Sequence, residues 1–217
     1  MAISEAARWR EMGLGTASEE AGEGVALVVL GILALAHVEP TILNSIAVIF
    51  AGIVLVVEGA MLSARYSKAL ARVSPETVNL TESSGTMTSS VLAGIAGIVL
   101  GILAIIGVAT EPLIAVALIV FGAAVLFDYT ARAHLRALRM MGGAMPGESA
   151  RIAMSAASTT NTAGVLVGVG LVTLGILSLV HIVPVVLAAA SFIGLGAYLL
   201  LEGTAASGWL LEVLATE

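Results

Sequence analysis

The stretch that decides the fold runs from residue 152 to residue 201 and reads IAMSAASTTNTAGVLVGVGLVTLGILSLVHIVPVVLAAASFIGLGAYLLL. Its 50 residues contain no Asp, Glu, Lys or Arg. Because one membrane-spanning helix needs about 20 apolar residues, this stretch holds two spans. The spans part near His181–Pro184, since proline suits the first turn of a helix, where its missing N–H leaves no bond unmade.

Two further stretches, residues 83–110 and 40–57, also lack charged residues. The whole chain of 217 residues carries 9 basic and 15 acidic residues, which is 11%. A soluble domain has about 25% charged residues, so this composition argues strongly against a water-soluble globule. The absence of cysteine excludes disulfides, thiolate metal sites and cysteine nucleophiles.

We therefore predict an all-α polytopic membrane protein with six transmembrane helices, near residues 19–38, 40–62, 87–108, 112–131, 162–182 and 184–205. A β-barrel is not expected, because barrel strands alternate apolar and polar residues and these segments are apolar on every face. Residues 1–18 then form an N-terminal cytoplasmic segment, and residues 206–217 form a cytoplasmic tail.

Self-similarity along the chain divides the six helices into three tandem hairpins, which cover residues 19–62, 87–131 and 162–205. The motif Gly-Ile-Leu recurs at offsets of 70 and 144 residues, at Gly31–Leu33, Gly101–Leu103 and Gly175–Leu177. The larger offset also aligns Pro40 with Pro184, whereas Pro112 is displaced by two positions. One hairpin cannot bury its inner face alone. The three should therefore pack as one domain over residues 19–205, joined by segments 63–86 and 132–161.

The basic residues set the orientation. In this topology all nine fall on one side of the membrane, at Arg8, Arg10, Arg65, Lys68, Arg72, Arg132, Arg136, Arg139 and Arg151. Cytoplasmic loops carry the excess of Lys and Arg. The sequence thus predicts a multi-pass protein of the inner (cytoplasmic) membrane with both termini in the cytoplasm.

Six of these basic residues form two periodic faces in the connecting segments. The first face is Arg65, Lys68 and Arg72, and the second is Arg132, Arg136 and Arg139. Both segments are predicted to be short amphipathic helices lying at the cytoplasmic interface. Their basic faces then bind lipid headgroups, where each basic residue contributes about 1 kcal/mol. The alternative is a docking surface for a protein partner.

The most suggestive candidate site is a set of acids that recurs once per hairpin, Glu58, Asp128 and Glu202. An acid within a membrane is costly, so a retained one usually has a partner or a role. These carboxylates could line a route for protons or cations, or they could accept hydrogen bonds from helix ends and arginines. Glu23, near the start of the first helix, is a further candidate, although the helix dipole alone favours an acid there.

His37 and His181 occupy equivalent turns on the opposite side and are candidate pH-responsive residues, because histidine changes charge between pH 5 and 8. An interfacial turn histidine is the simpler interpretation.

We predict no catalytic residues, no metal site and no cofactor, since no nucleophile, metal or phosphate-binding motif occurs. No nucleic-acid binding is expected either, since the small basic helices alone do not support it.

Three hairpins with the pattern Gly-Ile-Leu-x-Leu, Pro and Gly-x-x-Leu-x-x-Glu-Gly resemble the HdeD-like family of prokaryotic membrane proteins. The resemblance rests on Gly31, Gly101 and Gly175 with the prolines that follow them, and it covers roughly residues 19–205. It implies a membrane domain of short repeats and a link to stress and acid resistance. It implies no catalytic residues.

These observations together favour a non-enzymatic membrane protein with a stress-related, acid-resistance or structural role, including that of an accessory subunit of a membrane complex. Its expected partners are membrane lipids and either further copies of the chain or other membrane subunits. The alternative is a small channel or transporter that uses the repeated carboxylates for protons or cations.

Overall fold

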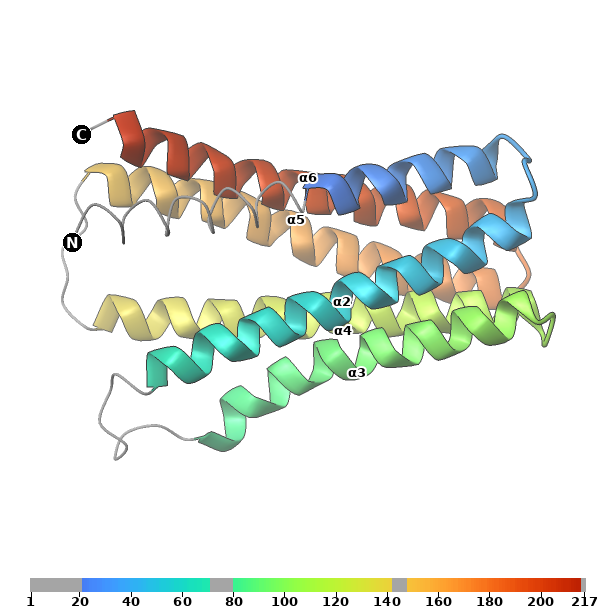
Figure 1. Cartoon of the computed structure of the whole chain (residues 1–217), viewed down its shortest axis with the longest axis horizontal. Helices are drawn as coiled ribbons and strands as arrows, with labels where there is room; N and C mark the ends of the chain where they lie inside the picture. Colours follow the sequence, from blue (N-terminus) through green and yellow to red (C-terminus); the bar gives the residue numbers. More distant parts are fainter. Residues whose placement is uncertain (1–20, 71–79, 142–147, 216–217) are drawn as a thin grey trace, which may run out of the picture.

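The computed structural model describes residues 21–70, 80–141 and 148–215, with side chains for residues 21–61, 89–128 and 162–202. Within these ranges the chain forms six helices and no strand. They are a first helix, Ala21–Leu35, followed by α2 (Pro40–Leu70), α3 (Leu80–Ile105), α4 (Thr110–Met141), α5 (Glu148–Leu179) and α6 (Pro184–Ala215). The helices run along one long axis, and three short turns join them in pairs at the same end (Figure 1). We call this end the turn end and the opposite one the loop end.

The described helices have the character of a membrane protein. Four of them contain stretches long and apolar enough to cross a membrane, at Pro40–Met61, Thr110–Asp128, Thr162–Leu179 and Pro184–Glu202. The first helix and Ser89–Ile105 are shorter apolar helices. Large apolar side chains also cover the outside of the bundle, and Leu166 and Ile106 are more than two-thirds exposed. Such a surface suits lipid rather than water.

The second helices of the three hairpins begin at residues 40, 110 and 184, directly after the three short turns. α2 and α6 begin at Pro40 and Pro184, as predicted. α4 begins at Thr110, two residues before the predicted start, so that Pro112 is its third residue. Backbone N–H groups of the first turn have no partner within the helix, and a proline there removes no hydrogen bond. The displaced proline is therefore compatible with the same turn.

The predicted interfacial helices are not separate elements. α2 continues without a break to Leu70, and α4 continues to Met141. No Gly or Pro follows Gly59 in α2 or Gly122 in α4, so nothing in the sequence ends either helix at the membrane boundary. A helix of 32 residues is about 48 Å long, which exceeds the roughly 30 Å of hydrocarbon in a bilayer. The basic residues of these two helices, Arg65, Lys68, Arg132, Arg136 and Arg139, thus lie on their loop-end parts.

The core lies where α2, α4 and α6 meet. Its largest fully buried side chains include Phe121 and Leu118 from α4 and Phe192 from α6, and Val48 of α2 is fully buried as well. The ring of Phe121 lies against Gly97 of α3, where a Cβ atom would be 2.3 Å from it. The remaining helices add fewer buried residues, such as Leu27 and Leu171. The three second helices of the hairpins are thus inside, and the three first helices cover them.

Glycines let neighbouring helices approach until their backbones touch. A Cβ atom at Gly24 of the first helix would lie 2.7 Å from the carbonyl oxygen of Gly196 in α6. A Cβ atom at Gly94 of α3 would lie 2.5 Å from the carbonyl oxygen of Gly52, and one at Gly122 of α4 would lie 2.7 Å from the carbonyl oxygen of Gly168. Distances this short leave no room for a side chain. Each of these pairs joins the first helix of one hairpin to the second helix of another.

We predict that Gly196→Ala destabilises the protein by about 1–3 kcal/mol, because the added methyl group forces the first helix away from α6. Its Cβ would lie 2.6 Å from the oxygen of Gly24 and 2.9 Å from the nitrogen of Val28, and backbone atoms cannot yield as a side chain can. The measurement is thermal or denaturant unfolding of the purified protein in detergent micelles.

The matched control is Gly194→Ala, two residues earlier on the same helix. A Cβ there meets nothing within 4 Å. This variant should be neutral, or more stable by up to about 1 kcal/mol, because alanine is the better helix former. Equal destabilisation by both variants would show that the close contact at Gly196 does not hold the first helix.

Candidate functional site

The three repeated acids lie just past the middle of the three inner helices, each at the nineteenth residue of its helix, Glu58 on α2, Asp128 on α4 and Glu202 on α6. Each is half-buried. Each follows, three positions later, one of the buried residues Leu55, Val125 and Leu199. Each is preceded directly by one of the exposed residues Val57, Phe127 and Leu201. Because residues three apart lie on the same side of a helix, each acid lies on the core-facing side of its helix.

These acids do not assemble a metal site. In the part of the chain whose side chains are described, no group of three or more His, Asp or Glu residues could hold a metal ion. Glu58, Asp128 and Glu202 each interact with other groups of the chain. The fully buried side chains of Phe121, Leu118 and Phe192 lie between the acids and the turn end. The carboxylates therefore border an apolar core.

Glu23 lies in the first turn of the described part of the first helix and is half-buried. It also interacts with another group of the chain. Its counterparts in the other hairpins are Ala93, which is buried, and Val167, which packs against the core. Glu23 thus brings a carboxylate to a position that is otherwise apolar.

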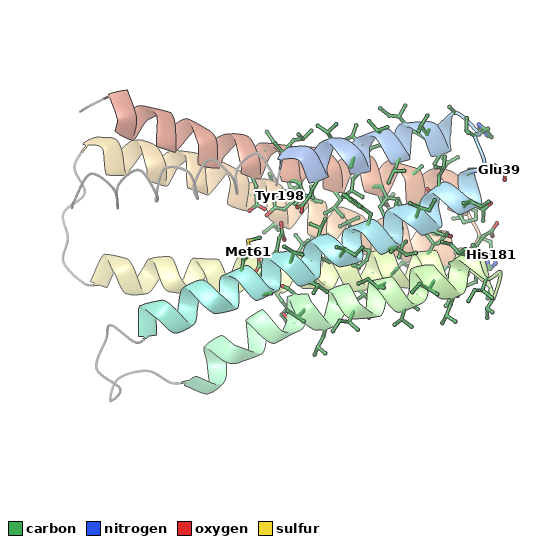
Figure 2. All side chains as sticks on the ribbon, in the orientation of Figure 1. Glu39, Met61, His181 and Tyr198 are labelled. Carbon is green, nitrogen blue, oxygen red and sulfur yellow. The ribbon has the colours of Figure 1, made fainter. Side chains whose placement is uncertain are left out.

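His37 and His181 are exposed in the turns that end the first helix and α5. Figure 2 shows His181 and Glu39 at the turn end, far from Met61 and Tyr198, which lie near the middle of the bundle. The backbone N–H of His37 donates to the oxygen of Ala34 at 3.2 Å, and the next N–H, of Val38, donates to Leu33 at 3.3 Å. This pair of hydrogen bonds is the Schellman motif.

The other two turns repeat the same hydrogen bonds, with Gly107 and His181 in the place of His37. All three residues have positive φ, 60° at His37, 90° at Gly107 and 64° at His181. Glycine is the usual residue here because a side chain is strained in this conformation. The histidines therefore occupy positions that favour glycine, and nothing in the geometry of the turn itself requires an imidazole.

A second strained position follows two residues later in each turn. Glu39, Ala109 and Val183 have φ values of 43°, 46° and 44°. A β-branched residue such as Val183 is rare in this conformation. The remaining acid of the turn end, Glu111, is exposed in the first turn of α4, where the helix dipole favours an acid.

The predicted basic faces lie on the loop-end parts of the long helices. Arg65 and Lys68 belong to α2, and Arg132, Arg136 and Arg139 belong to α4. Arg72 lies outside the described residues. Both interpretations of these residues, headgroup binding and partner docking, stay predictions.

Sequence reasoning missed two buried polar residues near the turn end, Asn44 on α2 and Ser178 on α5. Both are at least 97% buried. The signal that marks Asn44 is simple, because it is the only Asn, Gln or charged residue between Pro40 and Val57. A polar side chain inside such a span needs a partner.

No family model, curated protein or solved structure matches this chain.

We predict that His37→Gly and His181→Gly each stabilise the protein by about 0.5–1 kcal/mol. The left-handed conformation costs a side-chain-bearing residue about 1–2 kcal/mol, and the larger entropy loss of glycine on folding offsets part of the gain. The measurement is again unfolding in micelles.

The reverse change, Gly107→Ala, should destabilise the protein by about 1 kcal/mol. A Cβ at Gly107 meets nothing within 4 Å, so the effect comes from the backbone alone. Loss of stability in the two histidine variants would instead show that the imidazoles make contacts that the turn depends on.

Proposed function

We propose that the chain forms six membrane spans arranged as three equivalent hairpins in a closed ring. The glycine pairs support this arrangement. Gly94 and Gly168 follow Gly24 by the repeat offsets of 70 and 144, and Gly122 and Gly196 follow Gly52 by the same offsets. The pair that joins Gly24 to Gly196 is thus the counterpart of the two pairs between hairpins adjacent in sequence. The identical hydrogen bonds of the three turns support the same arrangement.

The orientation proposed from the sequence has the loop end and both termini in the cytoplasm, in the inner membrane of a prokaryote. All nine basic residues then lie on the cytoplasmic side, at the loop end or in the N-terminal segment. The turn end, with its four-residue turns, then faces the opposite side of the membrane.

Single-cysteine labelling tests this topology, because the chain contains no cysteine of its own. We expect Val38→Cys, Val108→Cys and Ile182→Cys to react with a membrane-impermeant maleimide in intact cells, since all three residues are exposed in the turns. Ser74→Cys and Gly143→Cys, in the connections of the loop end, should react only after the cells are permeabilised. Any connection that labels from the wrong side excludes six spans in this orientation.

For the activity, we propose a non-enzymatic structural membrane protein, of the stress-related kind that the HdeD-like resemblance implies, which includes a role as an accessory subunit. The observation that carries this proposal is a filled core inside an apolar surface. Val48, Leu118, Phe121 and Phe192 are fully buried where the inner helices meet, while large apolar residues face outward on every helix. Such a surface is suited to lipid and to neighbouring membrane helices.

A channel or transporter for protons or cations is the second candidate. The half-buried positions of Glu58, Asp128 and Glu202 favour it, because each acid lies on the core-facing side of an inner helix. The apolar side chains between the acids and the turn end oppose it, because a conducted ion needs polar groups or water along its path.

Proton flux into liposomes distinguishes the two candidates. We expect liposomes containing the purified protein and a pH-sensitive dye to take up protons no faster than protein-free liposomes. Flux in the native chain that is lost in the triple variant E58Q/D128N/E202Q would replace the structural proposal with transport.

The matched control for the triple variant is E39Q/E111Q, which removes two exposed carboxylates at the turn end and should leave any flux unchanged.

Purification from the native membrane after mild cross-linking tests the subunit role. A stoichiometric membrane partner supports it, and recovery of the chain alone contradicts it.

A further inference from the structure

Two buried polar atoms near the turn end have no hydrogen-bond partner among the described residues, Oδ1 of Asn44 and Oγ of Ser178. Their side chains are only 1% and 3% exposed. The amide of Asn44 is well placed otherwise, because its Nδ2 donates to the backbone oxygen of Val185 in α6 at 3.1 Å. Buried polar groups almost always have a partner, so these two atoms require one.

Ser178 differs from three hydroxyl-bearing residues elsewhere in these helices. Ser45, Ser191 and Thr173 each donate to the backbone oxygen four residues earlier, at 2.8–2.9 Å. This is the usual bond of a serine or threonine within an apolar helix. Ser178 lacks it. Its hydroxyl group is therefore available to a partner outside its own helix.

The two atoms belong to the same part of the bundle. Ser178 is the last residue but one of α5, and Val185, to which Asn44 is bonded, is the second residue of α6. A four-residue turn joins these helices, so Ser178 and Val185 lie at the same level. In the equivalent turn of the second hairpin, Thr110, the counterpart of Pro184, donates from Oγ1 to the backbone oxygen of Ala104, the counterpart of Ser178, at 2.9 Å.

The other two hairpin junctions are apolar at these positions. The counterparts of Asn44 are Ile114 and Ala188, and those of Ser178 are Ala34 and Ala104, all of them buried. Both polar residues thus occur at one junction out of three. That junction joins α2 to the α5–α6 hairpin, and these belong to the first and third hairpins, which no connecting loop links.

We propose that Asn44 Oδ1 and Ser178 Oγ together bind one buried water molecule, which links α2 to the start of the α5–α6 hairpin. Water has the chemistry that both atoms need. It donates to the amide oxygen, which can only accept, and it exchanges a second hydrogen bond with the hydroxyl group, which can donate or accept. Buried waters typically make about three such bonds to otherwise unsatisfied groups. This site goes beyond the proposed function, since it is independent of whether the protein transports ions.

The link has a structural purpose in the ring. Hairpins adjacent in sequence are joined covalently by the chain between them, whereas the first and third are joined by noncovalent contacts only. Interhelical hydrogen bonds from Asn and Ser strengthen helix association in lipid. The hydrogen bond from Asn44 to Val185 and the water bridge to Ser178 link the first and third hairpins, whereas a connecting segment of the chain links the other pairs.

The test is magnetisation transfer from water to the side-chain amide protons of Asn44, measured by NMR on the full chain in lipid nanodiscs. We expect a cross-peak of a long-lived water in the native protein and its loss in Ser178→Ala. The control is Ser191→Ala, which removes an equally buried hydroxyl that is bonded to its own helix and should leave the cross-peak unchanged. No cross-peak in the native protein, or an undiminished one in Ser178→Ala, overturns the proposal.

Melting temperatures give a second test that needs no spectral assignment. With a shared water, Ser178→Ala and Asn44→Leu each lower the melting temperature, and the double variant melts no lower than the worse single variant. If both atoms are merely unsatisfied, Ser178→Ala removes a buried unpaired hydroxyl group and raises the melting temperature, whereas Asn44→Leu still loses the hydrogen bond to Val185. That result would also overturn the water site.

Discussion

Direct backbone contact between helices at paired glycines is the constraint on which this structure depends. Lipid is as apolar as leucine, so burying apolar side chains gives membrane helices little reason to associate. What remains is close packing, and dispersion attraction falls steeply as helices separate. Gly24 against Gly196, and the two equivalent pairs, bring the backbones within reach of each other. The short turns and the stacked inner helices are arranged around these contacts.

The two layers of the bundle divide the work of packing. The inner helices supply the bulky core side chains, such as Phe121 and Phe192, and glycines of both layers provide the space into which those side chains or the neighbouring backbones fit. Gly97 under the ring of Phe121 is one example. A bulky side chain on one helix therefore faces a glycine on its neighbour, so that together they fill the space between the two helices.

The helical membrane character was predictable from the sequence, because charge-free stretches and proline positions report directly on spans and helix starts. The extent of the helices was not. Where Arg65 and Lys68 suggested an interfacial helix, the absence of a glycine or proline lets α2 continue to Leu70. Charge patterning indicates which residues meet water, but only a helix-breaking residue ends a helix.

The candidate acids illustrate a second limit. Their recurrence was visible in the sequence. Their place was not, because the inner helices continue well beyond them, and the apolar side chains that separate them from the turn end depend on packing between distant residues. Asn44 and Ser178 are 134 positions apart, and only the fold shows that both are adjacent to the start of α6. Pairings of this kind carry no local sequence signal.

The contact between the first helix and α6 has a consequence for biosynthesis. A chain is made from its N-terminus, so the first helix is synthesised long before the helix that covers it exists. Its glycine face lacks the α6 backbone as a partner while the next four helices are made. The ring can close only when α6 arrives, which makes the last helix synthesised the one that completes the packing of the first.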